Sequence, residues 1–363
     1  MIVRPRQHWL RMLFIWRGSV LPHILPQLVT VTGIAMLVTV LHGELFQLKV
    51  PLTFVPFTLI GVALAVFLGF RNSTSYDRYW EGRKLWGSIL AESRTLTRQI
   101  MTLPQAMDAT EQRQLVLTLV AIAYSLRHQL RQTDALADLQ RLLPADVCEM
   151  ALAARFAPNA LVLHLARQLQ TLRQQQQLDP ILAAEMEQPL ARLTDAICGC
   201  ERLNGTPLPY AYTVILHRTV YLYCFLLPFG LVDAIGWTTP IMVTFIAYTF
   251  FALEALSDEL EEPFGTSAND LPLEALSVMI ETTLREMLGD KTLPAPVTLA
   301  SPRSARCSRS PARSGRRRRR ARFRSCGHAA ARRRPAIALG SVRFWTTGRF
   351  SASDSIPPSA RYA

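Results

Sequence analysis

The stretch VALAVFLGFRNSTSYDRYWEGRKLWG, residues 62–87, decides how the rest of the chain is interpreted. It begins as an apolar run and continues directly into charges, hydroxyl groups and aromatic rings, with no proline between the two parts. A helix from Leu52 through Trp86 would be over ~45 Å long at 1.5 Å per residue, which exceeds the thickness of a bilayer core. The sequence therefore predicts a membrane helix that continues unbroken into water.

One face of this predicted helix is apolar at regular spacing. Leu59, Val62, Val66 and Phe70 follow one another at three or four residues. Such a stripe is most often a packing or lipid-facing surface. In a ring of helices around an axis it would instead form a hydrophobic constriction, which can gate ion flow by excluding water.

Four stretches approach the length of about 20 apolar residues that a bilayer core requires. They are about Ile24–His42, Leu52–Phe70, Tyr210–Val232 and Pro240–Leu256. The third contains His217 and Arg218 and the fourth contains Glu254, so these side chains should face protein or a water-filled cavity. Arg218 could equally extend its charge toward an interface.

The orientation follows from the distribution of basic residues. Arg4, Arg6, Arg11 and Arg17 precede the first span without any acid, which predicts a cytoplasmic N-terminus. Four spans return the C-terminus to the same side. Residues 43–51 then form a short outer loop, and residues 71 to about 205 and 257–292 form cytosolic helices. We expect a multi-pass membrane protein with both termini in the cytoplasm.

Residues 71–205 have the patterns of a helical domain. The run LVLTLVAIAYSL, residues 115–126, is too short for a span and fits a buried helix whose start is capped by Asp108 or Thr110. Leucines recur every three or four positions at 161, 165, 169 and 172. Asp179 before Pro180 is typical of a helix start, with Ile181 in the first turn. No strand pattern stands out, so the predicted fold class is all-α.

Residues 301–363 differ in composition from residues 1–300. They contain 17 Arg, no Lys and one acid, Asp354, a net charge of +16, whereas the whole chain carries +13, so residues 1–300 are slightly acidic at −3. We expect the tail to be disordered. It could hold anionic lipid or RNA, or it could be a nonfunctional extension from a shifted reading frame.

Few features point to catalysis or to a cofactor. The six cysteines are scattered apart from Cys198 and Cys200, and no nucleophile–base pair, metal-ligand box or phosphate-binding loop is evident. We therefore expect neither an enzyme nor a bound metal or cofactor.

Several separated motifs resemble the prokaryotic branch of the bestrophin family of ion channels. They are RGSV at 17–20, FRNSTSYDRYWEGRKLWG at 70–87 and DELEEPFG at 258–265. The resemblance covers roughly residues 1–292. It implies a homopentamer around one central pore, with a neck formed by Val62, Val66 and Phe70 and a cytosolic aperture at Ile181.

The polar residues after the stripe are candidates for the wall of a water-filled vestibule. Arg71, Asn72 and Ser73 directly follow Phe70, and Asp179 lies beside the predicted aperture. In animal bestrophins a run of acids follows the last motif and binds calcium. Here TSANDLPL follows, with Asp270 as its one acid, so we expect no calcium site. Arg78 and Glu81 stand three apart and could pair on the helix surface.

The sequence thus favours a passive channel for small monovalent ions, embedded in a lipid bilayer. The resemblance implies that this bilayer is the bacterial inner membrane. The resemblance implies chloride, and Arg71 favours anions, whereas Asp179 and Glu185 near the aperture favour cations. Two alternatives remain: a membrane scaffold that does not conduct, and a lipid or nucleic-acid tether acting through the tail. Nucleic acid is not expected as a partner of the channel itself.

Overall fold

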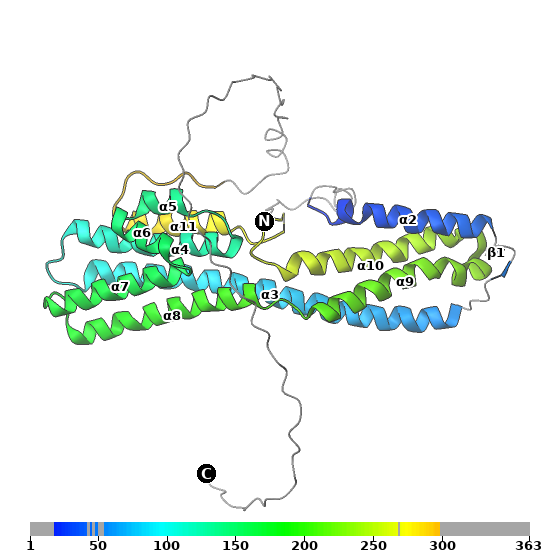
Figure 1. The fold of residues 1–363 in the computed structure, drawn as a ribbon, viewed down its shortest axis with the longest axis horizontal. Coiled ribbons are helices and arrows are strands. Elements are labelled where there is room, and N and C mark those ends of the chain that lie inside the picture. Colours follow the sequence, from blue (N-terminus) through cyan, green and yellow to red (C-terminus); the bar gives the residue numbers. More distant parts are fainter. Residues whose placement is uncertain (1–17, 42–43, 46–47, 50–53, 268, 298–363) are drawn as a thin grey trace, which may run out of the picture. The chain divides into compact units, whose positions relative to one another are not determined.

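The computed structural model describes residues 18–41, 44–45, 48–49, 54–267 and 269–297, and most of these residues are helical (Figure 1). The α-helices in chain order are α2 Leu21–Val40, α3 Phe54–Thr102, α4 Ala109–Arg131, α5 Leu136–Leu142, α6 Ala145–Ala153, α7 Ala157–Gln174, α8 Pro180–Gly205, α9 Tyr210–Ile235, α10 Thr239–Glu261 and α11 Leu273–Met287. A short 3-10 helix, η1 Gly236–Thr238, joins α9 to α10. The all-α prediction is confirmed in its main architecture.

The predicted outer loop contains a small element that the sequence did not indicate. Strands β1 Glu44–Leu45 and β2 Leu48–Lys49 pair antiparallel, with Leu45 opposite Leu48. Each strand has two residues, too few to show the alternation by which a strand is recognised in sequence.

Helix α3 is longer than predicted. It has 49 residues and ends at Thr102 rather than near Trp86, so its length is about 73 Å. The physical reason lies in the prolines. After Pro56 in the first turn none occurs until Pro104, and a proline disfavours helical conformation in the residue before it.

The first part of α3 packs with α2, α9 and α10 in an assembly that we call the apolar bundle (Figure 1). Its core contains Val31 of α2, Leu68 of α3, Cys224 of α9 and Ala247 of α10, all fully buried. Glycines allow α3 and α9 to approach closely. A Cβ atom on Gly230 would lie 2.6 Å from the ring of Phe57, a distance that side chains do not tolerate.

Three stretches are long and apolar enough to cross a membrane, namely Leu21–Val40, Val55–Thr102 and Tyr210–Glu261. The third comprises both α9 and α10, which η1 separates. Four helices of the described chain therefore overlap the four segments predicted as spans, of which His42, Leu52 and Thr53 lie outside the described residues.

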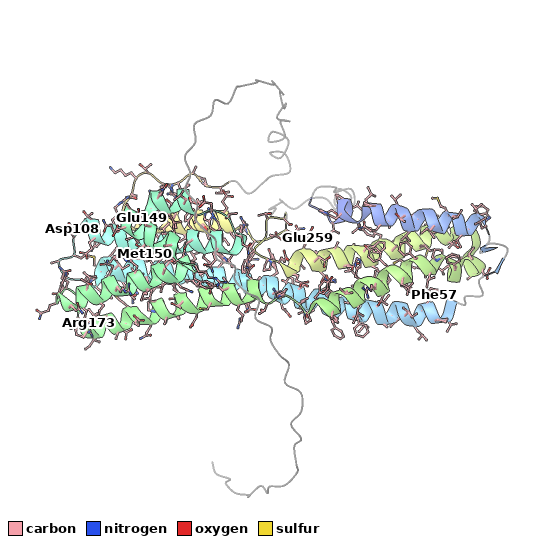
Figure 2. The ribbon with its side chains drawn as sticks, viewed as in Figure 1. Phe57, Asp108, Glu149, Met150, Arg173 and Glu259 are labelled. Carbon is pink, nitrogen blue, oxygen red and sulfur yellow. The ribbon has the colours of Figure 1, made fainter. Side chains whose placement is uncertain are left out.

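The second part of α3 packs with α4 to α8 and α11 in what we call the helical domain (Figure 1). The run 115–126 forms the buried centre of α4, and Leu161, Leu165, Leu169 and Leu172 of α7 are buried, as their spacing predicts. Asp108 caps α4 by accepting a hydrogen bond from the Thr110 N–H at 3.0 Å. Figure 2 shows Phe57 near one end of α3 and Asp108 beyond its other end.

Some predictions lie outside the described residues. These are the cytoplasmic placement of Arg4, Arg6, Arg11 and Arg17, the properties of the tail 301–363, and the Arg17 position of the first motif.

Candidate pore helix

The predicted neck residues lie together on the outer face of α3. Val62, Val66 and Phe70 have 66%, 50% and 64% of their surface exposed, and Leu59 on the same face is 71% exposed. Exposed apolar side chains on a membrane-spanning helix face either lipid or a neighbouring subunit. The opposite face of the helix, which includes Leu64 and Leu68, is buried in the apolar bundle.

Arg71 does not share the outer face with Phe70. It follows Phe70 by one residue and is therefore rotated by about 100° around the helix. Its side chain is 1% exposed, and its Nη2 atom lies 2.5 Å from Asp258 Oδ1 and 3.5 Å from Glu261 Oε2 of α10. The expected positive surface directly after Phe70 is therefore absent from this face of the described chain. The guanidinium is neutralised by the acids of the DELEEPFG motif instead.

The neighbouring polar residues divide between the two faces. Asn72 is partly buried and donates from Nδ2 to the Leu253 carbonyl at 3.1 Å, and the hydroxyls of Ser75 and Ser257 lie 3.0 Å apart. Ser73 is exposed on the face that also bears Phe70. Together with Arg71, the buried members form a polar junction between α3 and α10.

Arg78 joins three elements at the start of the helical domain. It donates to the carbonyls of Leu203 and Thr206 at 2.7 Å each and to that of Glu261 at 3.1 Å. The predicted Arg78–Glu81 pair is wrong because Glu81 binds Arg202 of α8 at 2.5 Å. The competing acceptors are the free carbonyls at the ends of α8 and α10, which sequence spacing does not reveal.

The predicted aperture residue lies at the far end of α3 from the neck residues. Ile181 is 75% exposed in the first turn of α8, and its N–H donates to Asp179 Oδ1 at 2.8 Å, which confirms the predicted cap. The pairs Glu81–Arg202 and Glu92–Arg192 show that α3 and α8 run antiparallel. Extrapolating that register places Ile181 near the end of α3, about 48 Å along the helix from Phe70.

The charged residues of α9 and α10 have separate environments. His217 Nδ1 lies 2.6 Å from Glu254 Oε1, so these two groups satisfy each other between the helices. Arg218 is exposed on the outside of the apolar bundle. The expectation that such groups face protein therefore holds for Glu254, whose side chain is 8% exposed, whereas His217 is 54% exposed and Arg218 faces outward from the single chain.

The segment TSANDLPL after α10 contains one acid, Asp270, and its side chain is buried. Asp270 is 4% exposed and accepts a hydrogen bond from the Ser267 N–H at 2.5 Å. Desolvation by burial raises the pKa of this carboxyl above its usual value. Among the described residues no group of three or more His, Cys, Asp or Glu is arranged to hold a metal ion.

The helical domain contains a buried charge cluster that sequence analysis missed. Glu281 of α11 is 1% exposed and accepts hydrogen bonds from Arg141 at 2.5 and 3.0 Å and from the Tyr124 hydroxyl at 2.7 Å. Arg285 lies 2.9 Å from the same carboxylate. These hydrogen bonds and cations outweigh desolvation and lower the pKa of Glu281. In the sequence, only the four-residue spacing of Glu281 and Arg285 could have suggested part of this charge cluster.

Comparison with known proteins agrees with this architecture. The family model described as bacterial/fungal bestrophin protein matches residues 1–286. The chain is 48% identical over 294 residues to a voltage-dependent anion channel-forming protein of Ralstonia nicotianae, covering 81% of this chain and 96% of that protein. It is 41% identical over 298 residues to a protein of the same description from Escherichia coli strain K12, covering 82% and 97%.

A solved structure extends the similarity to three dimensions. The crystal structure of a bacterial bestrophin homologue from Klebsiella pneumoniae matches with a TM-score of 0.72 at 43% identity, covering 74% of this chain and all of that chain. The fold of most of this chain is thus shared with a bacterial bestrophin homologue. The chain belongs to the bacterial and fungal bestrophin family.

Proposed function

We propose that this protein is a passive ion channel that assembles as a homopentamer, with five copies of α3 surrounding one central pore. The observation that carries the proposal is the exposed apolar stripe of Val62, Val66 and Phe70 on a helix that continues into a polar domain. A single chain leaves this stripe uncovered. A ring of five chains would turn it into a hydrophobic neck.

The proposed pore has two constrictions. The neck is formed by Val62, Val66 and Phe70, and the aperture by Ile181 at the other end of α3. Between them, the exposed face of α3 would line a water-filled vestibule that includes Ser73, with Asp179 beside the aperture. Arg71 and Asn72 would act behind this wall by holding α3 against α10.

Small monovalent ions are the proposed permeant species. The names of the relatives, as anion channel-forming proteins, support chloride as the physiological ion. Burial of Arg71 removes one reason for anion preference in this chain, so a preference for cations remains the competing outcome. We propose that no cofactor is required and that no calcium binds at the turn containing Asp270.

The proposed location is the bacterial inner membrane, with both termini in the cytoplasm. Four spans, formed by α2, the first part of α3, α9 and α10, are consistent with that topology. The helical domain would then be cytosolic.

A bilayer recording tests this function directly. The purified full chain is reconstituted into a planar bilayer under a potassium chloride gradient, and its oligomeric state is measured by native mass spectrometry. We expect a pentamer and a reproducible current whose reversal potential identifies the permeant ion. A folded protein of the same oligomeric state that never conducts would instead favour a membrane scaffold.

A further inference from the structure

The face of α3 that bears the neck stripe also carries two charged residues beyond it. Asp77 follows Phe70 by seven residues and Lys84 follows Asp77 by seven, and both side chains are exposed. Seven residues are two helical turns to within about 20°, so all three side chains leave the helix in nearly the same direction. Arg71, the nearest cation in sequence, points away and is buried.

Asp77 and Lys84 differ in their partners from Arg71, Glu81 and Glu92. Each of those three pairs with a residue of another helix. Among the described residues neither Asp77 nor Lys84 takes part in an ion pair. Their charges are therefore available to act on ions in solution.

We infer that Asp77 sets the charge preference of the channel from the helical-domain side of the neck, and that Lys84 opposes it. This inference rests on the proposed pentameric function. In a pentamer, Asp77 would form a ring of five carboxylates about 10 Å beyond Phe70, and Lys84 a ring of five ammonium groups about 20 Å beyond it. The first charge that an ion meets after the neck on this side is then negative.

Distance and screening determine which ring has the larger effect. The Debye length is about 10 Å at 0.1 M salt, so the potential of the Asp77 ring reaches the neck while that of the Lys84 ring is largely screened. Five unit charges at about this distance in water change the occupancy of the neck by about threefold to fourfold for each ion, in opposite directions for anions and cations, so the permeability ratio changes by about tenfold. At 1 M salt, where the Debye length is about 3 Å, this influence should vanish.

The test is the reversal potential of Asp77→Asn in a planar bilayer under a salt gradient around 0.1 M. We expect the permeability ratio to shift toward anions by about tenfold relative to the unmodified channel, and the shift to disappear near 1 M salt. Asp77→Glu keeps the charge and should behave like the unmodified protein. Lys84→Gln should shift the ratio in the opposite direction by a smaller factor.

A matched control removes the same charge elsewhere. Glu149, labelled in Figure 2, is an exposed acid on α6 rather than on α3, and Glu149→Gln should leave the reversal potential unchanged. Unaltered reversal potentials in both Asp77→Asn and Lys84→Gln at low salt, with current retained, would overturn the inference alone. Absence of current from the unmodified protein would overturn the proposed function and with it this inference. If Asp77→Asn fails to assemble, the Lys84→Gln variant tests the inference. A shift of its permeability ratio toward cations supports the inference, and a shift toward anions overturns it.

Discussion

For the buried Arg71–Asp258 pair we predict that the more conservative substitution, Asp258→Asn, destabilises the protein more than Arg71→Met does. Asp258→Asn removes the close carboxylate and leaves a guanidinium with no exposed surface and only Glu261 at 3.5 Å. Removing one partner of a buried ion pair generally costs about 3–5 kcal/mol. Because Glu261 remains nearby, we expect a cost of about 2–4 kcal/mol here.

Arg71→Met removes the buried charge itself, whereas Asp258→Asn leaves that charge without its close partner. Asp258 has 60% of its side chain exposed and can be solvated by water, so its loss of a partner is inexpensive. Replacing a buried ion pair by apolar groups is often neutral. We therefore expect Arg71→Met to cost less than about 1 kcal/mol and the double variant to resemble Arg71→Met rather than Asp258→Asn.

The assay is thermal unfolding of the reconstituted protein, followed by tryptophan fluorescence at a single heating rate. A cost of 2–4 kcal/mol should lower the apparent Tm of Asp258→Asn by about 5–10 °C, with a change of no more than about 3 °C for Arg71→Met. Equal Tm losses in the two variants, or a larger loss for Arg71→Met, would refute the argument that desolvation of the guanidinium dominates at this junction.

Three further predictions concern the neck, the aperture and the helical domain. Phe70→Ala should widen the neck and raise single-channel current or abolish closure, and unchanged conductance and gating would remove Phe70 from the neck. Ile181→Ala should change the permeability ratios among ions of different size more than the total current, and identical ratios would remove Ile181 from the aperture. Glu281 has a folded-state pKa below its unfolded value of about 4.3. Its contribution to stability is therefore complete above a pH of about 4.3 and is lost as the pH falls through the lower folded-state pKa. We expect the Tm of Glu281→Gln to be lower than that of the unmodified protein at pH 7, and the difference in Tm to become smaller below a pH of about 4.

The α3 stripe illustrates what spacing alone can predict. Val62, Val66 and Phe70 recur with helical period, and helical period fixes a common face wherever the helix is unbroken. The same reasoning succeeds for the leucines of α7 and for the cap at Asp179, because each depends on neighbours within four residues. Local periodicity therefore predicted most of the helices and the direction of the candidate neck residues.

The polar residues after Phe70 show where local reasoning fails. Consecutive residues of a helix point in different directions, so Arg71 cannot extend the surface of Phe70 merely by following it. Its partner Asp258 lies 187 residues away, and no local pattern joins them. Asp77, by contrast, could have been found by counting seven residues from Phe70. The Glu281 cluster was missed for the same reason as the Arg71 pair, since it gathers groups from α4, α5 and α11.

The continuity of α3 also restricts how the gene for such a protein can change. Inserting or deleting one residue between Phe70 and Trp86 would rotate everything beyond it by about 100°. Trp86, which is 1% exposed, would then leave the core of the helical domain, and Glu81 would turn away from Arg202. Codon insertions should accumulate in the connections around residues 43–51 and 103–108, and homologous chains should keep the number of residues in this segment constant.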